Sequence, residues 1–377
     1  MGDGFPRRPV SALAVNLDGA RTPVRARDRR PGPYPYYGAS GVIDHVDGYL
    51  FEGLHLLVAE DGENLRSRKT PVAFLADGRF WVNNHAHVLR GSDVADTRFL
   101  AYAIEAADIS GYLTGSTQPK LTQAALNRIE VPAPSIEEQR AIAEVVGALD
   151  DKIESNRRRA DIAESLLDVL VVAVAGPDVV PLRELVQVDR ASCTPASAGA
   201  TLVDHFSLPA FDAARLPDRT AGGSIKSNKL VVDSESVLVS RLNPGTNRTW
   251  FAVPEPGVLA AASTEFMVLR PGSRVGLGGL WLAVRDEFFR SELARRATGT
   301  SGSHQRVRPD DMLSIEVPDV RALAAAQDAE AEGLLRLVHQ ARTESATLAE
   351  LRDALLPELL SGRLRVPLAE DLVGAAR

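Results

Sequence analysis

Apolar and small residues recur at alternating intervals of four and three between Ser135 and Gly176. This spacing predicts one long helix with a continuous apolar seam, about 40 residues and about 60 Å long. Ser135, followed three residues later by Glu138, forms a capping box at its start, and Gly176-Pro177 ends the pattern. Asn156 is the polar member of a seam that otherwise comprises Ile142, Val146, Leu149, Ile153, Ala160, Ala163, Leu167, Leu170 and Val174.

A second pattern of the same kind predicts a helix from about Arg321 to Leu360, ended by Ser361-Gly362 and kinked near Pro357. Helices of this length with a period of about 3.5 residues need a partner helix, and the simplest partner of each is the other. The pair is either a plain structural bundle or a spacer of fixed length. The seam of the second helix comprises Leu334, Val338, Ala341, Ser345, Leu348, Leu355 and Leu359.

Short apolar runs separated by turn residues precede each long helix. Such runs lie in residues 34–60 and 229–270, where Asn243-Pro244-Gly245 and Pro254–Gly257 mark turns. Shorter helices are expected at 97–108 and 280–296. These patterns predict two α+β globular domains of about 140 residues each, together with the helix pair.

Sequence fragments of the first half recur in the same order in the second half. IEVP stands at Ile129–Pro132 and Ile315–Pro318, TG at Thr114 and Thr298, and VLR at Val88–Arg90 and Val268–Arg270. Pro9-Val10 with Leu13 likewise resembles Pro181-Leu182 with Leu185. This order predicts a duplicated unit of one globular domain and one helix. The expected segments are domain 1 (1–135), helix 1 (136–176), domain 2 (177–320), helix 2 (321–362) and a tail (363–377).

Composition places the chain among folded globular proteins, with 45% hydrophobic and 25% charged residues. The net charge of −7, from 43 basic and 50 acidic residues, argues weakly against a dedicated nucleic-acid binder. The apolar run at 169–175 is too short to span a membrane, and the N-terminus lacks the apolar core of a secretory signal. We therefore expect a cytoplasmic protein without a membrane segment.

Catalytic and metal-binding motifs are absent from the sequence. There is no P-loop, Asn243-Pro244 continues as Gly-Thr rather than as an adenine-holding Asn-Pro motif, and the glycines at 276–279 suggest a plain loop. His85 and His87 are more typical of surface histidines, or of histidines satisfied by ordinary hydrogen bonds, than of a metal site. Asp150-Asp151-Lys152 is typical of a solvated helix face, and the single cysteine, Cys193, lacks a histidine–acid pair. We expect no catalytic residue, no bound metal and no enzymatic activity in this chain.

The segments YPYYGASGVI (34–43), the stretch from Gly48 to Arg90, TGSTQPKLTQ (114–123) and EEQRAIAEVV (137–146) together resemble the specificity subunit of type I restriction–modification enzymes. The resemblance is specific in residues 1–155. It is looser but in order over 177–365, where TGTSGSHQRV (298–307) matches the end of a second recognition domain.

This resemblance implies two strand-rich target recognition domains joined by two long antiparallel coiled-coil helices, an α+β fold with a pseudo-twofold internal repeat. It implies that the chain recognises two short half-sites on double-stranded DNA separated by an unspecified spacer. The implied partners are two methyltransferase subunits, which methylate adenine with S-adenosylmethionine, and restriction and motor subunits that use ATP and Mg. No cofactor is implied for this chain itself.

Base reading requires polar and basic side chains on exposed loops, although each such residue is also compatible with an ordinary turn or surface. A coiled-coil scaffold that organises protein partners without reading DNA is the alternative function. In domain 1 the candidates for DNA binding are Tyr37, Gly38, Ser40, Asn64, Arg66, Arg68, Lys69, Asn83, Asn84, His85, Ser116, Thr117, Gln118 and Lys120. In domain 2 they are Lys226, Asn228, Lys229, Arg241, Asn243, Asn247, Arg248, Ser303, His304, Gln305 and Arg306.

Overall fold

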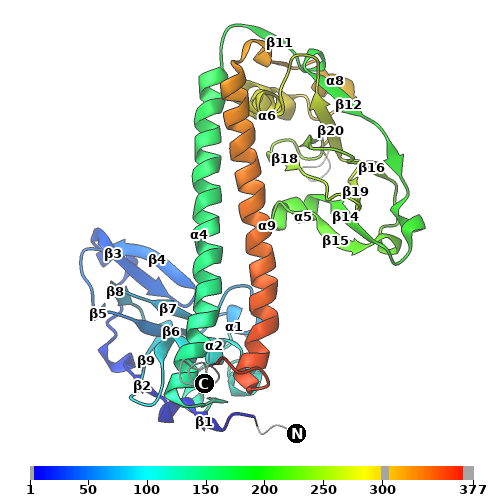
Figure 1. Ribbon diagram of the computed structural model, residues 1–377. Helices are drawn as coiled ribbons and strands as arrows, with labels where there is room; N and C mark the ends of the chain where they lie inside the picture. Colours follow the sequence, from blue (N-terminus) through cyan, green and yellow to red (C-terminus); the bar gives the residue numbers. More distant parts are fainter. Residues whose placement is uncertain (1–3, 299–304, 368–377) are drawn as a thin grey trace, which may run out of the picture. The chain divides into compact units, whose positions relative to one another are not determined.

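The computed structural model describes residues 4–298 and 305–367 (Figure 1). The chain divides into two compact units. The first unit consists of Met1–Asp151 and Leu348–Arg377, and the second unit of Lys152–Thr347. Each unit therefore holds one globular domain together with a segment of both long helices.

The long helices are α4 (Ile136–Val174) and α9 (Ala325–Ser361). The capping box of α4 is formed as the sequence predicts, since the Ser135 and Glu138 side chains each accept a hydrogen bond from the other residue's backbone N–H. The start predicted for α9 is about four residues too early. Val320–Ala322 forms a separate 3₁₀ turn, capped by the Asp319 carboxylate, and Leu323 is extended.

The two helices run antiparallel within each unit. In the first unit the apolar cluster includes Ile142 and Val146 of α4 with Leu359 and Leu360 of α9, while Asp150 pairs with Arg352. In the second unit Asn156 donates to Glu344, and Leu167 shares a cluster with Leu335. The large apolar residues of the predicted seam are buried to different degrees. The buried ones are Ile142, Val146, Ile153, Leu167, Val338 and Leu359. The partly buried ones are Leu149, Leu170, Leu334, Leu348 and Leu355.

Domain 1 contains two four-stranded sheets. The first sheet is antiparallel, in the order β2 (Ala14–Asn16), β9 (Ala86–Gly91), β6 (His55–Ala59), β7 (Ala73–Ala76). The second has the order β4 (Gly41–Val46), β3 (Pro31–Gly38), β8 (Arg79–Val82), β5 (Phe51–Glu52), with β3 and β8 parallel. Its helices are α1 (Asn64–Ser67), α2 (Thr97–Glu105) and α3 (Gln123–Leu126), and β1 (Arg7–Pro9) pairs with β10 (Glu130–Pro132).

Domain 2 repeats this order of strands. Its antiparallel sheet is β12 (Val186–Asp189), β20 (Phe266–Pro271), β17 (Ser236–Ser240), β18 (Thr249–Ala252). The second sheet is β15 (Asp218–Ala221), β14 (Leu202–Phe206), β19 (Leu259–Ala262), β16 (Lys229–Val231), with β13 (Ser192–Cys193) added at its edge and β14 parallel to β19. β11 (Val179–Pro181) pairs with β21 (Glu316–Pro318). The helices are α5 (Leu208–Ala213), α6 (Leu277–Arg285), α7 (Glu287–Arg295) and α8 (Pro309–Leu313).

The prediction of one continuous helix near the end of domain 2 is wrong. The sequence suggests a single helix over 280–296, but α6 and α7 are separate. Asp286 between them has ψ 141°, and its carboxylate accepts hydrogen bonds from the N–H groups of Phe288 and Phe289. Asp286 therefore caps α7 and interrupts the backbone ladder of α6.

The internal repeat predicted from the sequence is confirmed by strand register. The IEVP segments form β10 and β21, and each pairs with the strand that enters its domain, with Arg7 opposite Pro132 and Val179 opposite Pro318. Just beyond these strands, Val10 N–H donates to the Ile129 carbonyl and Leu182 N–H to that of Ile315, both at 2.9 Å. The predicted fold class is confirmed. Within the described ranges, no helix is long and apolar enough to cross a bilayer.

Candidate nucleic-acid interface

Three loops of domain 1 that are distant in sequence meet at the ends of β6 and β9. Glu60 N–H donates to the His85 carbonyl (2.9 Å), Gly62 N–H to Pro119 (3.1 Å), and Leu121 N–H back to Glu60 (2.8 Å). We call residues 60–70, 83–85 and 114–121 loop cluster 1. It brings together three of the four groups of candidates chosen in domain 1.

Some candidates of loop cluster 1 hold the loops in shape. The Asn64 side chain donates to the Thr70 carbonyl and accepts from its N–H (2.8 and 2.9 Å). Arg68 has a left-handed backbone (φ 49°) and donates to the carbonyls of Glu105 and Ala107 (2.7 and 2.8 Å). Arg66 donates to the carbonyls of Gly115 and Ser116 across the cluster. Other candidates of loop cluster 1 are exposed and therefore accessible to a ligand. They are Lys69, Asn84, Ser116, Thr117 and Gln118.

A network of charges lies beneath the cluster. Glu60 contacts Arg21 (2.9 Å) and Lys120 (3.1 Å), and Asp18 contacts His87 (2.6 Å) and accepts from Val88 N–H (2.9 Å). Burial would raise the pKa of the Asp18 and Glu60 carboxyls, but hydrogen bonds to both, with nearby positive charge, leave each pKa below its ordinary value. Both carboxylates therefore stabilise the fold in their charged form.

The two histidines considered as metal ligands have other partners. His87 is buried, and its Nε2 contacts the Leu121 carbonyl at 2.8 Å, opposite the Asp18 contact. His85 is half-exposed and contacts the Asp61 carboxylate at 2.8 Å. Over residues 4–298 and 305–367, no group of three or more His, Cys, Asp or Glu side chains is arranged to hold a metal ion.

The fourth group of candidates in domain 1 lies on the β3–β4 turn. It joins loop cluster 1 through Asn83, whose N–H donates to the Tyr37 carbonyl (3.0 Å) and whose side chain accepts from His85 N–H (2.8 Å). The Tyr37 ring packs against Phe80, and burial raises the pKa of its hydroxyl. Gly38 and Asn83 are buried and Ser40 is exposed, so this turn offers mainly Ser40 to a ligand.

Domain 2 repeats the hydrogen bonds of loop cluster 1. Arg241 N–H donates to Glu265 (2.8 Å), Asn243 N–H to Gln305 (2.8 Å), and Val307 N–H to Arg241 (3.1 Å). The isolated bridges of Lys120 to Thr114 and Asp61 correspond to those of Arg306 to Thr298 and Leu242. We call residues 241–248, 263–265 and 305–307 loop cluster 2. Ser303 and His304 lie outside the residues that the structure describes.

Equivalent positions in the two clusters share backbone hydrogen bonds but differ in charge. Gly62 and Asn243 both have positive φ, 109° and 49°. Glu60, His85 and Lys120 of cluster 1 correspond to Arg241, Glu265 and Arg306 of cluster 2, by the hydrogen bonds given above. The same scaffold thus carries two different arrangements of charge.

Arg306 is the most exposed charged group with a defined position in loop cluster 2. Its guanidinium donates to both oxygens of Glu265, with distances of 2.7 to 3.1 Å, and is 48% exposed. These hydrogen bonds hold the pKa of Glu265 below its ordinary value. Arg241 donates to the Thr264 carbonyl, Asn247 accepts from Thr249, and Arg248 forms a two-bond pair with Asp212 (2.7 and 2.8 Å).

Lys226, Asn228 and Lys229 lie on another part of domain 2. Lys226 and Asn228 lie just before β16 and Lys229 is its first residue, on the sheet that does not contain β17 and β20. Lys226 donates to the Gly223 carbonyl, and Asn228 accepts from Thr194. Lys229 is buried, donates to Ser227, and has its pKa lowered by burial. Assignment of these three residues to DNA remains a prediction without support from loop cluster 2.

Sequence reasoning missed Ser263, Thr264 and Glu265. Glu265 N–H donates to the Ser263 hydroxyl as His85 N–H donates to Asn83, and Ser263 N–H donates to Phe206 as Asn83 N–H donates to Tyr37. The repeated VLR at Val88 and Val268 places these segments at equivalent distances upstream. Applying that repeat to the candidates of domain 1 would have identified them.

Comparison with known proteins identifies related chains. Residues 15–164 match the family described as type I restriction modification DNA specificity domain. A putative type I restriction enzyme specificity subunit of Haemophilus influenzae is 37% identical over 142 residues, 38% of this chain and 36% of that protein. The type I restriction enzyme MjaIX specificity subunit of Methanocaldococcus jannaschii is 29% identical over 117 residues, 29% of this chain and 27% of the relative. The matches thus span about a third or less of these relatives.

The fold is similar over a larger part of the chain. The crystal structure of a type I restriction–modification S subunit from M. genitalium superimposes with a TM-score of 0.69, covering 95% of this chain and 96% of the other at 16% identity. The resemblance predicted from the sequence is confirmed by the family match within residues 15–164, and the predicted fold is confirmed over nearly the whole chain.

Proposed function

We propose that this chain, which belongs over residues 15–164 to the type I restriction modification DNA specificity domain family, is the specificity subunit of a type I restriction–modification complex. In this proposal it recognises a bipartite site on double-stranded DNA and performs no catalysis. It positions two adenine methyltransferase subunits, and restriction and motor subunits where present. Cofactors in this family are in general carried by the partner subunits.

The observation that carries the proposal is the occurrence of two loop clusters with one hydrogen-bond pattern and different charges. Each cluster presents polar side chains on a backbone fixed by long-range hydrogen bonds, which is what reading base edges in a groove requires. Two recognition domains related by an internal repeat suit duplex DNA, whose sugar-phosphate backbone has local twofold symmetry. Different charges at equivalent positions, such as His85 and Glu265, suit two half-sites of different sequence.

Overall charge is compatible with this role. The chain has a net charge of −7, so binding to DNA phosphates by this chain alone is expected to be weak. Methyltransferase subunits bound to the same duplex can supply further phosphate contacts. We therefore expect sequence-specific binding to be measurable chiefly for the assembled complex.

An exposed apolar stripe on α4 supports a protein partner. Ile162, Leu166, Val169 and Val172 lie on one face of the helix and are 62, 49, 64 and 75% exposed. Apolar patches of this kind mark interaction sites. We assign this stripe to a methyltransferase subunit. The pure scaffold hypothesis is not favoured, because the matched family is one of DNA specificity domains.

The test is to delete the gene in its host, compare adenine methylation by single-molecule sequencing, and identify the proteins that co-purify with the tagged chain. Loss of one bipartite methylated motif, together with recovery of a methyltransferase, supports the proposal and reveals both half-sites. An unchanged methylome with other proteins recovered contradicts it. The variant Val169→Asp should reduce recovery of the methyltransferase, whereas the exposed polar substitution Glu154→Gln should not.

A further inference from the structure

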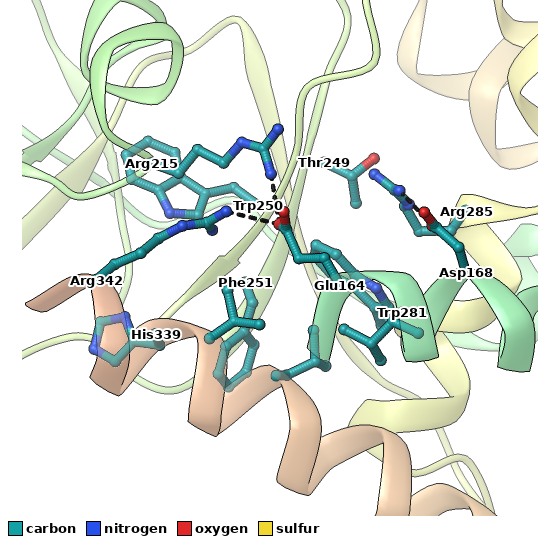
Figure 2. Close-up of a pocket in the computed structure, with 13 residues that line it drawn as sticks. Glu164, Asp168, Arg215, Thr249, Trp250, Phe251, Trp281, Arg285, His339 and Arg342 are labelled. Carbon is teal, nitrogen blue, oxygen red and sulfur yellow. Dashed lines mark hydrogen bonds and ion pairs between the residues drawn. The ribbon is translucent and has the colours of Figure 1, made fainter. Parts of the chain in front are cut away.

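One carboxylate of α4 links domain 2 to both long helices. In the second unit, Glu164 Oε1 accepts hydrogen bonds from Arg342 Nη2 of α9 (2.7 Å) and from Arg215 Nη1 (2.6 Å), as Figure 2 shows. Arg215 lies in domain 2, just after α5, with a left-handed backbone of φ 53°. Glu164 Oε1 thus connects α4 to α9 and to the segment that follows α5, which are far apart in sequence.

The linkage sits in a pocket between domain 2 and the helices. Trp250, Phe251 and Trp281 of domain 2 line it, with Val338 and His339 of α9 (Figure 2). A second ion pair, from Arg285 of α6 to Asp168 of α4, lies along its wall at 2.9 Å. The apolar contacts hold the domain against the helices without direction, whereas the ion pairs have directional geometry.

The first unit contains a matching linkage. Asp150 of α4 accepts from Arg352 Nη1 of α9 (2.8 Å) with one oxygen and from the Tyr102 hydroxyl of α2 (2.8 Å) with the other. Burial and the neighbouring Asp150 raise the pKa of Tyr102, so its hydroxyl remains a donor at neutral pH. In both units, therefore, an α4 carboxylate bonds simultaneously to the globular domain and to α9.

We propose that Asp150 and Glu164 are positioning residues that fix the orientation of each recognition domain on the helix pair, and thereby set the spacer length at which both half-sites are bound. The inference rests on the proposed function. Adding one base pair rotates a half-site by about 34° and shifts it by about 3.4 Å, because a helical turn holds about 10.5 base pairs. A domain held by directional bonds resists that rotation more than one held by apolar contact alone.

The experiment uses the complete complex with its methyltransferase subunits and duplexes that carry the native spacer or one base pair more or less. The variants are Glu164→Gln and Asp150→Asn, which keep the side-chain size and remove the charge. The matched control is Glu154→Gln, because Glu154 is an exposed residue of α4 that contacts Arg158 of the same helix (2.9 Å). We expect the preference for the native spacer to fall about 10-fold in each variant, and affinity for the native duplex to fall less than about threefold. The control should match wild type.

A second variant distinguishes a loss of domain positioning from a loss of folding. Arg215→Gln alters the domain side of the linkage and should reproduce the effect of Glu164→Gln, with no further loss in the double variant. Thermal unfolding of each variant should remain within a few degrees of the Glu154→Gln control. Unchanged spacer preference, or equal loss of binding at all spacers, overturns the positioning role. A wild-type complex without any bipartite preference instead contradicts the proposed function.

Discussion

From the proposed function we predict that Arg306 of loop cluster 2 leaves its carboxylate partner and contacts DNA when the complex binds its site. In the free protein the Arg306 guanidinium is bonded to Glu265, with side chains 48 and 22% exposed. An ion pair this accessible to water contributes about 0.2–1 kcal/mol. A two-bond contact of arginine with guanine contributes about 1–3 kcal/mol. A guanine contact of this kind would outweigh the ion pair, so Arg306 is expected to leave Glu265 if it reads a base of the second half-site.

Two substitutions should therefore act in opposite directions. Arg306→Ala should weaken binding of the assembled complex by about 1–2 kcal/mol, which is about 5- to 30-fold. Glu265→Gln removes a competing acceptor and a negative charge near the phosphates, and should strengthen binding by up to about 1 kcal/mol, or about fivefold. The matched control is Arg363→Ala, since Arg363 forms a similar exposed two-bond pair with Glu358 on a segment outside the cluster.

The assay is fluorescence anisotropy of the complex on the cognate duplex and on a duplex with the second half-site scrambled, over a series of salt concentrations. A base contact by Arg306 predicts that Arg306→Ala loses affinity for the cognate duplex alone. A phosphate contact predicts loss on both duplexes, and a salt slope smaller by about 0.9. Affinities within twofold of wild type for both variants, with unchanged salt slopes, would refute the reasoning. In domain 1, Lys69→Ala should weaken binding in the same assay, because Lys69 is exposed on loop cluster 1.

Three other predictions concern stability. Asn243→Gly should increase the free energy of unfolding by about 1 kcal/mol, because Asn243 has φ 49° and its buried Oδ1 accepts no hydrogen bond from the residues that the structure describes; a lower free energy from urea unfolding would contradict the strain. Asn156→Ala should destabilise by about 1–3 kcal/mol in calorimetry, because the fully buried Asn156 donates to Glu344; an unchanged transition would contradict it. Asp18 and Glu60 have lowered pKa values, so the unfolded state binds more protons and stability falls as pH drops below about 4.5. Urea unfolding at pH 7 and pH 3.5 measures this loss, which Asp18→Asn should reduce.

Sequence patterns predicted long elements well and short ones less well. The helix of Ile136–Val174 could be placed because its period continues over many turns and its capping box is local. The break at Asp286 could not be placed, because the apolar residues of α6 and α7 continue a helical pattern, while the interruption depends on a side chain turning back to cap the next helix. The 3₁₀ turn before α9 was not predicted either, because it also depends on a capping side chain, that of Asp319.

The candidate DNA-binding residues show the same limit of prediction from local sequence. Lys69, Asn84 and Gln118 could be chosen as polar residues on loops, and the structure leaves them exposed. Asn64, Arg66 and Arg68 have similar residue types, but their side chains bond to the backbone of their own domain. Polarity in sequence does not distinguish a side chain that faces a ligand from one that bonds to a backbone carbonyl of its own domain.

The duplication, the two long helices and the family resemblance could be recognised without the structure, because helical periodicity and capping are local patterns and the order of the repeated segments is written in the chain. Which loops meet, which charges pair, and the bonds of Asp150 and Glu164 to a globular domain and to α9 are known only from the folded structure. Those contacts join residues that are far apart in the chain. They are fixed by sheet order and helix packing, whose energy depends on the whole fold rather than on any local pattern.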